Sequence, residues 1–335
     1  MRKLASIQKV SAKIPIEGAD LIELLKINDW QVVAAKAENY QVDDEIVYFE
    51  IDSFLPIRNE FEFLRKNCYK KMADDSEGFR LRTIKLRGQY SQGLVLHKHL
   101  FPEIENAKLG DDVTELLGVR KYEPPVPASL QGVAKGLFPS FIRKTDEERV
   151  QNLSDSYPAL QKHQYYVTEK IDGTSATFYF KDNEFGVCSR GLELIETPEN
   201  TYWKIARDFN LEEIFRKNGK NIALQGEIFG ESIQSNKYKK QGQTIRFFSL
   251  FDIDSYSYTS LNDLKNFCIN NQLPIIPILD ENFTLPNTIE ELLNFANGKS
   301  VIHEQTKREG IVLRTLDSKI SFKAISNEFL LKYEE

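Results

Sequence analysis

The sequence has little of what marks a secreted protein, a membrane protein or a thiolate metal site. It has only three cysteines in 335 residues, and Cys68, Cys188 and Cys268 lie far apart, which argues against a disulfide framework and against a zinc–thiolate site. No apolar run approaches the roughly 20 residues that cross a bilayer, and the first residues lack the apolar core of a secretory signal. We therefore expect a soluble, intracellular protein with no membrane partner.

Histidine and net positive charge are also scarce. Of the four histidines only His97 and His99 are neighbours, and we interpret this pair as surface residues rather than metal ligands. The net charge of −6 excludes a protein that binds nucleic acid over its whole surface, so any such binding must be local. Basic residues gather in two stretches, 80–87 and 237–246, although such stretches are more often simply solvated.

The length predicts two domains, because a single core rarely serves more than about 200 residues. Short β-segments separated by turn residues run from residue 4 to about 113, which favours a five-stranded OB-like barrel. Proline and glycine then interrupt the pattern, and alternating strands and helices follow. We therefore predict an OB-like domain at residues 1–118, a linker at 119–142 and an α+β domain of antiparallel sheets and helices at 143–335.

Apolar periodicity and capping residues predict the helices of the second domain. They are expected at residues 198–217, 260–271 and 288–297. A further short helix is expected to begin within the charged run at 143–149, with Thr145 or Asp146 as its cap, and to lead through Arg149 and Asn152.

The most informative local string is Lys170-Ile171-Asp172-Gly173, in which a strand delivers a lysine into a turn. By itself the pattern is common and is equally consistent with a hairpin turn that exposes a lysine. Single polar residues recur at later strand ends, at Glu227, Glu309 and Lys323. Each has an ordinary interpretation as one polar end of a half-buried strand, but their order along the chain is harder to explain by chance.

In that order the strings resemble the motifs of the covalent nucleotidyltransferase superfamily, which includes polynucleotide ligases and RNA capping enzymes. The matching strings are Lys170-Ile171-Asp172-Gly173, Ser189-Arg190-Gly191, Glu227, Phe251, Glu309-Gly310 and Lys323. Strings at residues 2–7, 15–20, 48–53 and 145–152 resemble a narrower family, the RNA ligases of the Deinococcus and Naegleria type. One departure is Ser321, which stands where some RNA ligases carry a first lysine, and Lys319 is a candidate substitute.

The resemblance implies an amino-terminal OB-like β-barrel followed by an ATP-grasp-like nucleotidyltransferase domain. Lys170 would attack ATP and become bonded to AMP, after its pKa is lowered from the usual ~10.4. A metal ion, Mg²⁺ or Mn²⁺, would be held by Asp172, Glu227 and Glu309, and Lys323 would neutralise the α-phosphate.

The resemblance also implies which residues bind the nucleotide. Phe251 would stack on adenine. Backbone groups at Thr168 and Glu169 would read the edge of the base, and Arg190 and Glu227 would meet the ribose. The β- and γ-phosphates are assigned to Arg149 and Lys237.

The implied substrate is nicked or broken RNA, which could be paired with RNA or DNA, and a monomer is expected to act on it. AMP would pass from the lysine to the RNA 5′-phosphate, and the RNA 3′-OH would then displace AMP.

Two alternatives share part of this pattern. Capping guanylyltransferases and DNA ligases carry an OB domain after the last motif, whereas here 12 residues follow Lys323 and the barrel is expected at the other end. A nucleic-acid-binding protein with an inactive transferase fold is the other alternative. Inactivation should have removed a lysine or a carboxylate of the motifs, and all are present.

Overall fold

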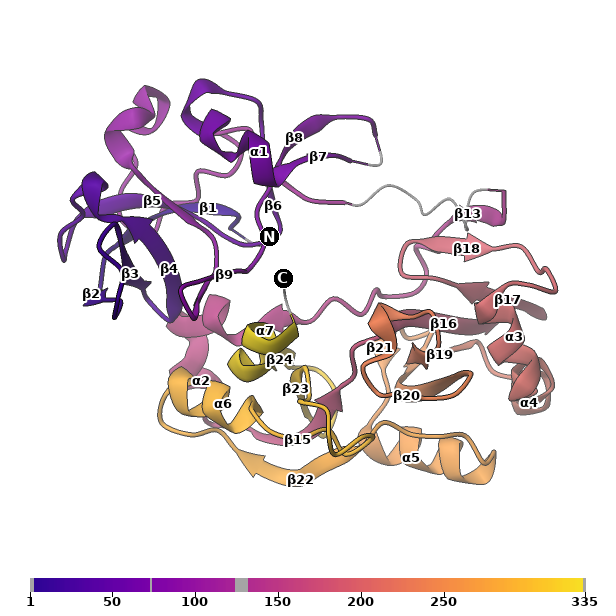
Figure 1. The fold of residues 1–335 in the computed structure, drawn as a ribbon. Helices are drawn as coiled ribbons and strands as arrows, with labels where there is room; N and C mark the ends of the chain where they lie inside the picture. The colour runs from indigo at the N-terminus through magenta and orange to yellow at the C-terminus, as the bar shows by residue number, and fades with distance from the viewer. Residues whose placement is uncertain (1–2, 73, 124–131, 334–335) are drawn as a thin grey trace. The chain divides into compact units, whose positions relative to one another are not determined.

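The structure is a computed structural model that describes residues 3–72, 74–123 and 132–333. It divides the chain into two compact units, which consist of Met1–Pro127 with Leu330–Glu335 and of Ala128–Phe329. Figure 1 shows the elements of both units.

The first unit is built almost entirely from short strands. They are β1 Ala5–Lys9, β2 Ala12–Pro15, β3 Ile22–Ile27, β4 Trp30–Ala35, β5 Glu45–Phe49, β6 Ser53–Leu55, β7 Tyr69–Lys71, β8 Glu77–Arg80, β9 Ile84–Leu86, β10 Gln89–Ser91, β11 Leu94–His97 and β12 Arg120–Lys121. A short helix, α1 (Arg65–Cys68), lies between β6 and β7. The strands form sheets in the orders β1-β5-β11, β2-β3-β4, β12-β6-β8-β7 and β9-β10.

Strand β5 lies at the centre of the first unit because both of its faces are buried. Successive side chains of a strand point to opposite faces. Val47 and Phe49 therefore pack in one apolar core, and Ile46 and Tyr48 pack in another. The unit is the small β-rich domain that the sequence predicts.

The second unit is α+β, as predicted. Its strands are β13 Ala134–Leu137, β14 Glu148–Arg149, β15 Gln164–Lys170, β16 Thr174–Lys181, β17 Glu184–Cys188, β18 Leu192–Leu194, β19 Ile222–Gly230, β20 Gln243–Asp252, β21 Ser257–Tyr258, β22 Ile278–Thr284, β23 Gly310–Thr315 and β24 Ser321–Ile325. Its helices are α2 Tyr157–Leu160, α3 Thr201–Asp208, α4 Leu211–Asn218, α5 Leu261–Asn270 and α6 Ile289–Ala296, and the described chain ends with α7 Asn327–Tyr333.

These strands form two sheets whose helices each cover one face. The larger sheet has the order β13-β18-β17-β16-β19-β20-β21, and the smaller has the order β14-β24-β23-β15-β22. Helices α3, α4 and α5 share one apolar core with β16, β19 and β20, whereas α6 packs on β15, β23 and β24. The opposite face of the larger sheet carries a smaller apolar cluster that includes Tyr179, Ala223 and Phe251, and polar side chains such as Glu227 lie elsewhere on that face.

Two of the predicted helices are confirmed, and their caps explain why. Ser260 and Asp263 form a capping box at the start of α5, and Thr288 and Glu291 form another at the start of α6. The single helix expected at 198–217 is wrong. Asn210 adopts a left-handed conformation (φ 50°), and this breaks the segment into α3 and α4.

The short helix expected after residue 143 is also wrong. Residues Glu148–Arg149 form β14, which pairs in parallel with β24, and a 3₁₀ turn at Val150–Ser156 follows. Part of the expected linker is also in sheets, because β12 pairs with β6 and β13 pairs with β18. All four residues of β13 are exposed, so the strand has no apolar alternation that could reveal it. Residues 124–131 of the expected linker lie outside the described residues.

Among residues 3–72, 74–123 and 132–333, every helix is too short or too polar to cross a lipid bilayer.

Candidate functional site

A pocket of about 390 Å³ lies in the second unit, lined by strands of both sheets. On β15, Tyr165 and Val167 pack against the core under α6, so Thr168 and Lys170 fall on the other face. On β19, Leu224 and Ile228 pack under the helices of the larger sheet, so Glu227 falls on its other face. Strand alternation therefore directs polar side chains from both sheets into one pocket.

The structure brings together most of the residues that the sequence singles out. Those that line the pocket are Thr168, Glu169, Lys170, Asp172, Arg190, Glu227, Glu309 and Lys323. Three do not line it: Arg149, Lys237 and Phe251. Residues that line it without having been predicted include Glu147, Gln234, Phe248, Ile276, Val312 and Arg314.

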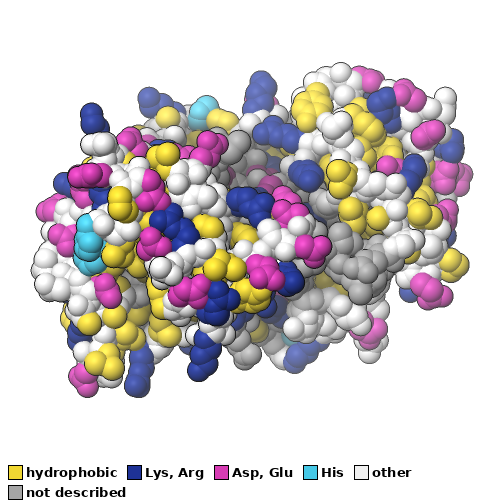
Figure 2. Space-filling model, turned by 90° about the horizontal axis from the view of Figure 1, so that it is seen from above, with side chains coloured by type: hydrophobic (Ala, Val, Ile, Leu, Met, Phe, Trp, Pro, Cys, Tyr) yellow, Lys and Arg dark blue, Asp and Glu magenta, His cyan; other side chains and the backbone are white. Residues whose placement is uncertain are grey.

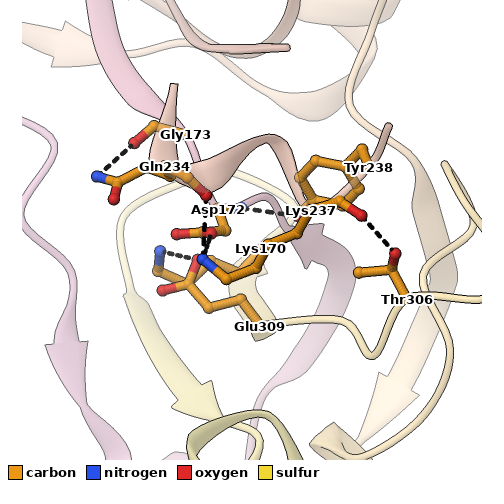
Figure 3. Close-up of polar contacts among 8 residues, drawn as sticks. All are labelled: Lys170, Asp172, Gly173, Gln234, Lys237, Tyr238, Thr306 and Glu309. Carbon is orange, nitrogen blue, oxygen red and sulfur yellow. Dashed lines mark hydrogen bonds and ion pairs between the residues drawn. The ribbon is translucent and has the colours of Figure 1, made fainter. Parts of the chain in front are cut away.

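Lys170 ends β15 and is held by an ion pair. Its Nζ lies 2.7 Å from Oε2 of Glu309, and the two side chains are 26% and 17% exposed (Figure 3). Burial acts to lower the pKa of Lys170, but the carboxylates of Glu309, Glu227 and Asp172 outweigh it and raise the pKa above its usual value. In this form the lysine is an ammonium ion and is therefore not a nucleophile.

The turn after Lys170 depends on a glycine. A Cβ atom at Gly173 would lie 2.3 Å from the carbonyl oxygen of Ile228, so no larger residue fits. The turn thus brings Asp172 close against β19.

Asp172 has partners from a segment distant in sequence. Its carboxylate Oδ2 lies 2.5 Å from Nζ of Lys237, and its backbone N–H donates to the Tyr238 hydroxyl at 2.8 Å (Figure 3). The hydroxyl of Thr306 donates to the carbonyl of Lys237 at 2.7 Å. Lys237 therefore contacts Asp172, which lines the pocket, although Lys237 itself does not line it.

Glu227 is the third predicted metal ligand, and burial raises its pKa to about 8. The charges of Glu309 and Asp172 act in the same direction, and those of Lys170 and Arg190 oppose it. At neutral pH this carboxyl group is therefore mostly protonated.

The three carboxylates are the right donors for Mg²⁺ or Mn²⁺, which take oxygen ligands. In the described part of the chain, however, no three Asp, Glu, His or Cys side chains are grouped to hold a metal ion. Asp172 and Glu309 bind lysines instead. The pocket therefore has the donor atoms but not an assembled metal site.

Lys323 and Arg149 form a second cationic region at this pocket. Arg149 on β14 lies opposite Lys323 on β24 in the parallel pair. Burial, followed by the charges of Arg149 and Lys170, lowers the pKa of Lys323 to about 8. Lys319 is not a substitute for the missing first lysine, because its side chain is 82% exposed and lies 3.1 Å from Asp317.

The expectation for the aromatic residue of the site is wrong by three residues. Phe251 is fully buried, with its ring against Tyr256 and Tyr258, and it does not line the pocket. Phe248 lines it instead. A β-bulge in β20 leaves Phe248 as an extra residue between the partners of Gln225 and Gly226, and such bulges re-aim side chains.

A buried ion pair supports Phe248, and the sequence analysis missed it. Nη2 of Arg314 lies 2.8 Å from Oε1 of Glu147, and the guanidinium carbon lies 5.4 Å from the centre of the Phe248 ring. Burial acts to lower the pKa of Arg314, but Glu147 outweighs it, so the group stays charged. The available signal was an arginine within the otherwise apolar strand Gly310–Thr315.

The remaining predicted residues differ in where their side chains lie. The Glu169 carboxylate accepts a hydrogen bond from the backbone N–H of Val301 at 2.8 Å, and burial raises its pKa. Thr168 donates weakly to the carbonyl of Val312 at 3.4 Å. Arg190 is 72% exposed, so it belongs to the rim of the pocket.

Two family models match the chain. One described as an OB-fold domain matches residues 4–98, and one described as RNA ligase matches residues 163–333. No curated protein matches.

Solved structures of Naegleria gruberi RNA ligase are similar over almost the whole chain. An apo mutant is 42% identical, with 99% of this chain and 98% of that chain covered and a TM-score of 0.87. A mutant with AMP and Mn is 42% identical, with 99% of each chain covered and a TM-score of 0.88. A mutant with ATP and Mn is 42% identical, with 100% of each chain covered and a TM-score of 0.87.

The raised pKa of Glu227 predicts a pH-dependent stability. Between the ordinary carboxyl value of 4.5 and about 8 the folded chain binds a proton that the unfolded chain releases, so this group's contribution to stability falls as pH rises. Glu227→Gln removes the contribution. We expect the melting temperature of the variant to rise relative to the unsubstituted protein from pH 5 to pH 8, without nucleotide or metal.

The matched control is Glu304→Gln, which changes an exposed carboxylate. If the melting temperatures of the unsubstituted protein and of Glu227→Gln changed in parallel with pH, the assignment of a proton to Glu227 would be contradicted.

Proposed function

The chain belongs to the RNA ligase family, and we propose that it is an ATP-dependent ligase that joins RNA 3′-OH and 5′-phosphate ends through a lysyl-AMP intermediate. The observation that carries the proposal is Lys170 itself, a half-buried lysine that meets three carboxylates and a second lysine in one pocket. We further propose that it acts as a monomer on nicks in duplexes that contain RNA.

In the first step the Lys170 ammonium loses its proton and its Nζ attacks the α-phosphorus of ATP. An N–P bond forms, the bond from that phosphorus to the bridging oxygen breaks, and pyrophosphate leaves with the electron pair. Glu309 must release the lysine first, because the ion pair favours the charged form. Lys323, with Arg149 beside it, supplies positive charge for the α-phosphate.

A divalent cation that enters with ATP would bind among Asp172, Glu227 and Glu309 and add positive charge at the phosphates. The Naegleria relatives were solved with Mn and with ATP or AMP.

The next two steps transfer AMP and then release it. An oxygen of the RNA 5′-phosphate attacks the AMP phosphorus and displaces Lys170, which gives a 5′–5′ pyrophosphate linkage. The RNA 3′-OH then attacks the 5′-phosphate, forms the phosphodiester, loses its proton and displaces AMP.

The adenosine contacts follow from the pocket lining. We assign adenine stacking to Phe248 in place of Phe251, and reading of the base edge to the backbone of Thr168 and Glu169. Arg190 and Glu227 are assigned to the ribose. Arg149 and Lys237 are assigned to the β- and γ-phosphates.

The first unit is assigned to the nucleic acid, with residues 1–118 as its domain and 143–335 as the adenylyltransferase domain. Acidic and basic side chains are mixed over the face seen in Figure 2, so binding must rely on local features. The hairpin β9–β10 is such a feature, because it turns at Arg87 and Gly88 and no acidic residue occurs between Gly78 and Pro102. Arg82, Lys85 and Arg87 are exposed there and suit a phosphate backbone.

Lys170→Met tests the chemistry directly. The substitution keeps a side chain of similar length but removes the amine, so we expect no AMP adduct in intact-protein mass spectrometry after incubation with ATP and Mg²⁺ or Mn²⁺. Lys240→Met, which changes an exposed lysine, is the control and should still be labelled. An adduct on folded Lys170→Met would remove Lys170 from this role.

Phe248→Ala and Phe251→Ala separate stacking from packing. Loss of one aromatic–base stack is worth about 1–3 kcal/mol, so Phe248→Ala should weaken ATP binding by roughly 5- to 150-fold with little change in stability. Phe251→Ala empties a buried site and should lower the free energy of unfolding by about 3–5 kcal/mol. Calorimetric titration with ATP measures the first effect, and urea unfolding measures the second. If Phe251→Ala weakened ATP binding and Phe248→Ala instead lowered the free energy of unfolding, the assignment of adenine stacking to Phe248 would be refuted.

Arg82→Ala/Arg87→Ala tests the hairpin. If both side chains contact phosphates, the salt dependence of nicked-duplex binding should become shallower by up to about 2 in log–log slope, while AMP labelling stays unchanged. The control is Lys66→Ala/Lys108→Ala, which removes two exposed lysines elsewhere in the first unit. Equal slopes for the hairpin variant and the control would rule the hairpin out as a phosphate-binding surface.

A further inference from the structure

Two of the three carboxylates predicted as metal ligands are bound to lysines. Lys170 is within 2.7 Å of Glu309, and Lys237 is within 2.5 Å of Asp172. The Lys237 and Asp172 side chains are only 16% and 15% exposed, so water screens this pair poorly. A cation that used either carboxylate would have to compete with an ammonium ion already there.

The segment that carries Lys237 connects β19 to β20 and is under backbone strain. Its non-glycine residues with positive φ are Ser232, Gln234, Ser235, Asn236 and Lys239. Such conformations persist only where the surroundings hold them, and they are concentrated at functional sites.

Two of the contacts that hold this segment in place lie at Lys237 and Tyr238. Tyr238 is only 3% exposed, its ring centre lies 5.3 Å from that of Phe229, and its hydroxyl accepts from the backbone of Asp172. Thr306 donates to the carbonyl of Lys237 at 2.7 Å. The position of Lys237 is therefore set by the rest of the unit and is not that of a free surface lysine.

The same contacts join the two ion pairs into one network (Figure 3). Thr306 lies three residues before Glu309, so the segment that positions Lys237 also carries the partner of Lys170. A short stretch of three residues therefore links the contact that positions Lys237 to the partner of Lys170.

We propose that Lys237 and Lys170 form ion pairs with Asp172 and Glu309 in the nucleotide-free chain. Because of these ion pairs the free chain binds a divalent cation weakly and takes it up only together with the nucleotide. This inference rests on the proposed function, because it takes the nucleotide as the ligand that brings the cation. It also explains why the described carboxylates are not grouped as a metal site.

The physical basis is competition followed by exchange of partners. A cation binds the carboxylates only as strongly as it outcompetes the ammonium groups, which keeps its affinity for the free protein low. A triphosphate offers oxygen acceptors to Lys237 and so frees Asp172. By linkage, the nucleotide and the cation must then raise each other's affinity by the same factor.

The test measures Mn²⁺ binding to the nucleotide-free protein by the EPR signal of free Mn²⁺. Lys237→Met removes the ammonium but keeps the length of the side chain, and we expect Mn²⁺ to bind on the order of tenfold more tightly or better. Lys240→Met is the matched control, because it removes an equal charge from an exposed position of the same segment. Lys237→Arg keeps the positive charge of the side chain, so its affinity for Mn²⁺ should stay as low as that of the unsubstituted protein.

Two further variants show whether Asp172 is the group released. In Lys237→Met/Asp172→Asn the gain in Mn²⁺ affinity should disappear. Thr306→Val, which removes only the hydroxyl that holds the Lys237 carbonyl, should give a smaller gain and keeps the test valid if Lys237→Met does not fold. Folding is checked by circular dichroism and thermal melting.

The proposal is overturned if Lys237→Met binds Mn²⁺ no more tightly than Lys240→Met, or if the gain survives Asp172→Asn. A non-hydrolysable ATP analogue should strengthen Mn²⁺ binding much less in Lys237→Met than in the unsubstituted protein, and an equal effect in both would also overturn it. Because Mn²⁺ binding to the free chain requires no ligation, a failure of AMP labelling at Lys170 would refute the proposed function separately.

Discussion

The antiparallel pairing of β15 with β23 is the constraint on which the pocket depends. It places Gly310 opposite Lys170 and so brings the preceding residue, Glu309, to the lysine ammonium. The next strand must also approach closely, because a Cβ at Gly310 would lie 2.3 Å from the carbonyl oxygen of Ala324. The β23–β24 register then sets Lys323 opposite Val312, on the pocket face. One slip of register would turn all of these side chains to the other face.

Charge balance is the second organising principle of the pocket. Burying an unpaired charge is costly, so buried charges in folded proteins are paired or change their protonation. Each buried group here follows one of these courses. Arg314 is paired with Glu147 and Lys237 with Asp172, whereas Glu227 keeps a proton and Lys323 has a lowered pKa. The charges of the pocket are thus balanced by its own side chains, and a charged ligand must exchange partners with groups that are already paired.

The strain in the β19–β20 connection is consistent with that exchange. Local backbone strain is concentrated at functional sites, and elements that change conformation can adopt two arrangements. In the exchange that we propose, the β19–β20 connection would hold Lys237 against Asp172 in one arrangement and against the phosphates in the other. The first unit has a different character. Its apolar cores surround β5, and its hairpin β9–β10 carries basic side chains in a stretch of sequence that contains no acidic residue. The two units thereby divide nucleotide chemistry from contact with the nucleic acid in the function that we propose.

The sequence by itself determined the features that depend on a few neighbouring residues. The strand-ending lysine with its Asp-Gly turn, the polar residues at the ends of later strands and the capping boxes of α5 and α6 are all local patterns. The resemblance of those ordered patterns to the nucleotidyltransferase motifs predicted that Lys170, Asp172, Glu227, Glu309 and Lys323 belong to one site, and all five line the pocket.

Only the tertiary structure decided which of these groups touch one another and which aromatic ring enters the pocket. Glu147 and Arg314 are 167 residues apart, and Lys170 and Glu309 are 139 apart, so each partnership depends on sheet pairing that no local window contains. Phe251 lies farther along β20 in a cluster with Tyr256 and Tyr258, whereas Phe248 is the bulged residue at the pocket, and a bulge reflects the pairing of two strands rather than the propensity of either. Local patterns therefore predicted the candidate site residues, and long-range pairing set their partners and their orientation.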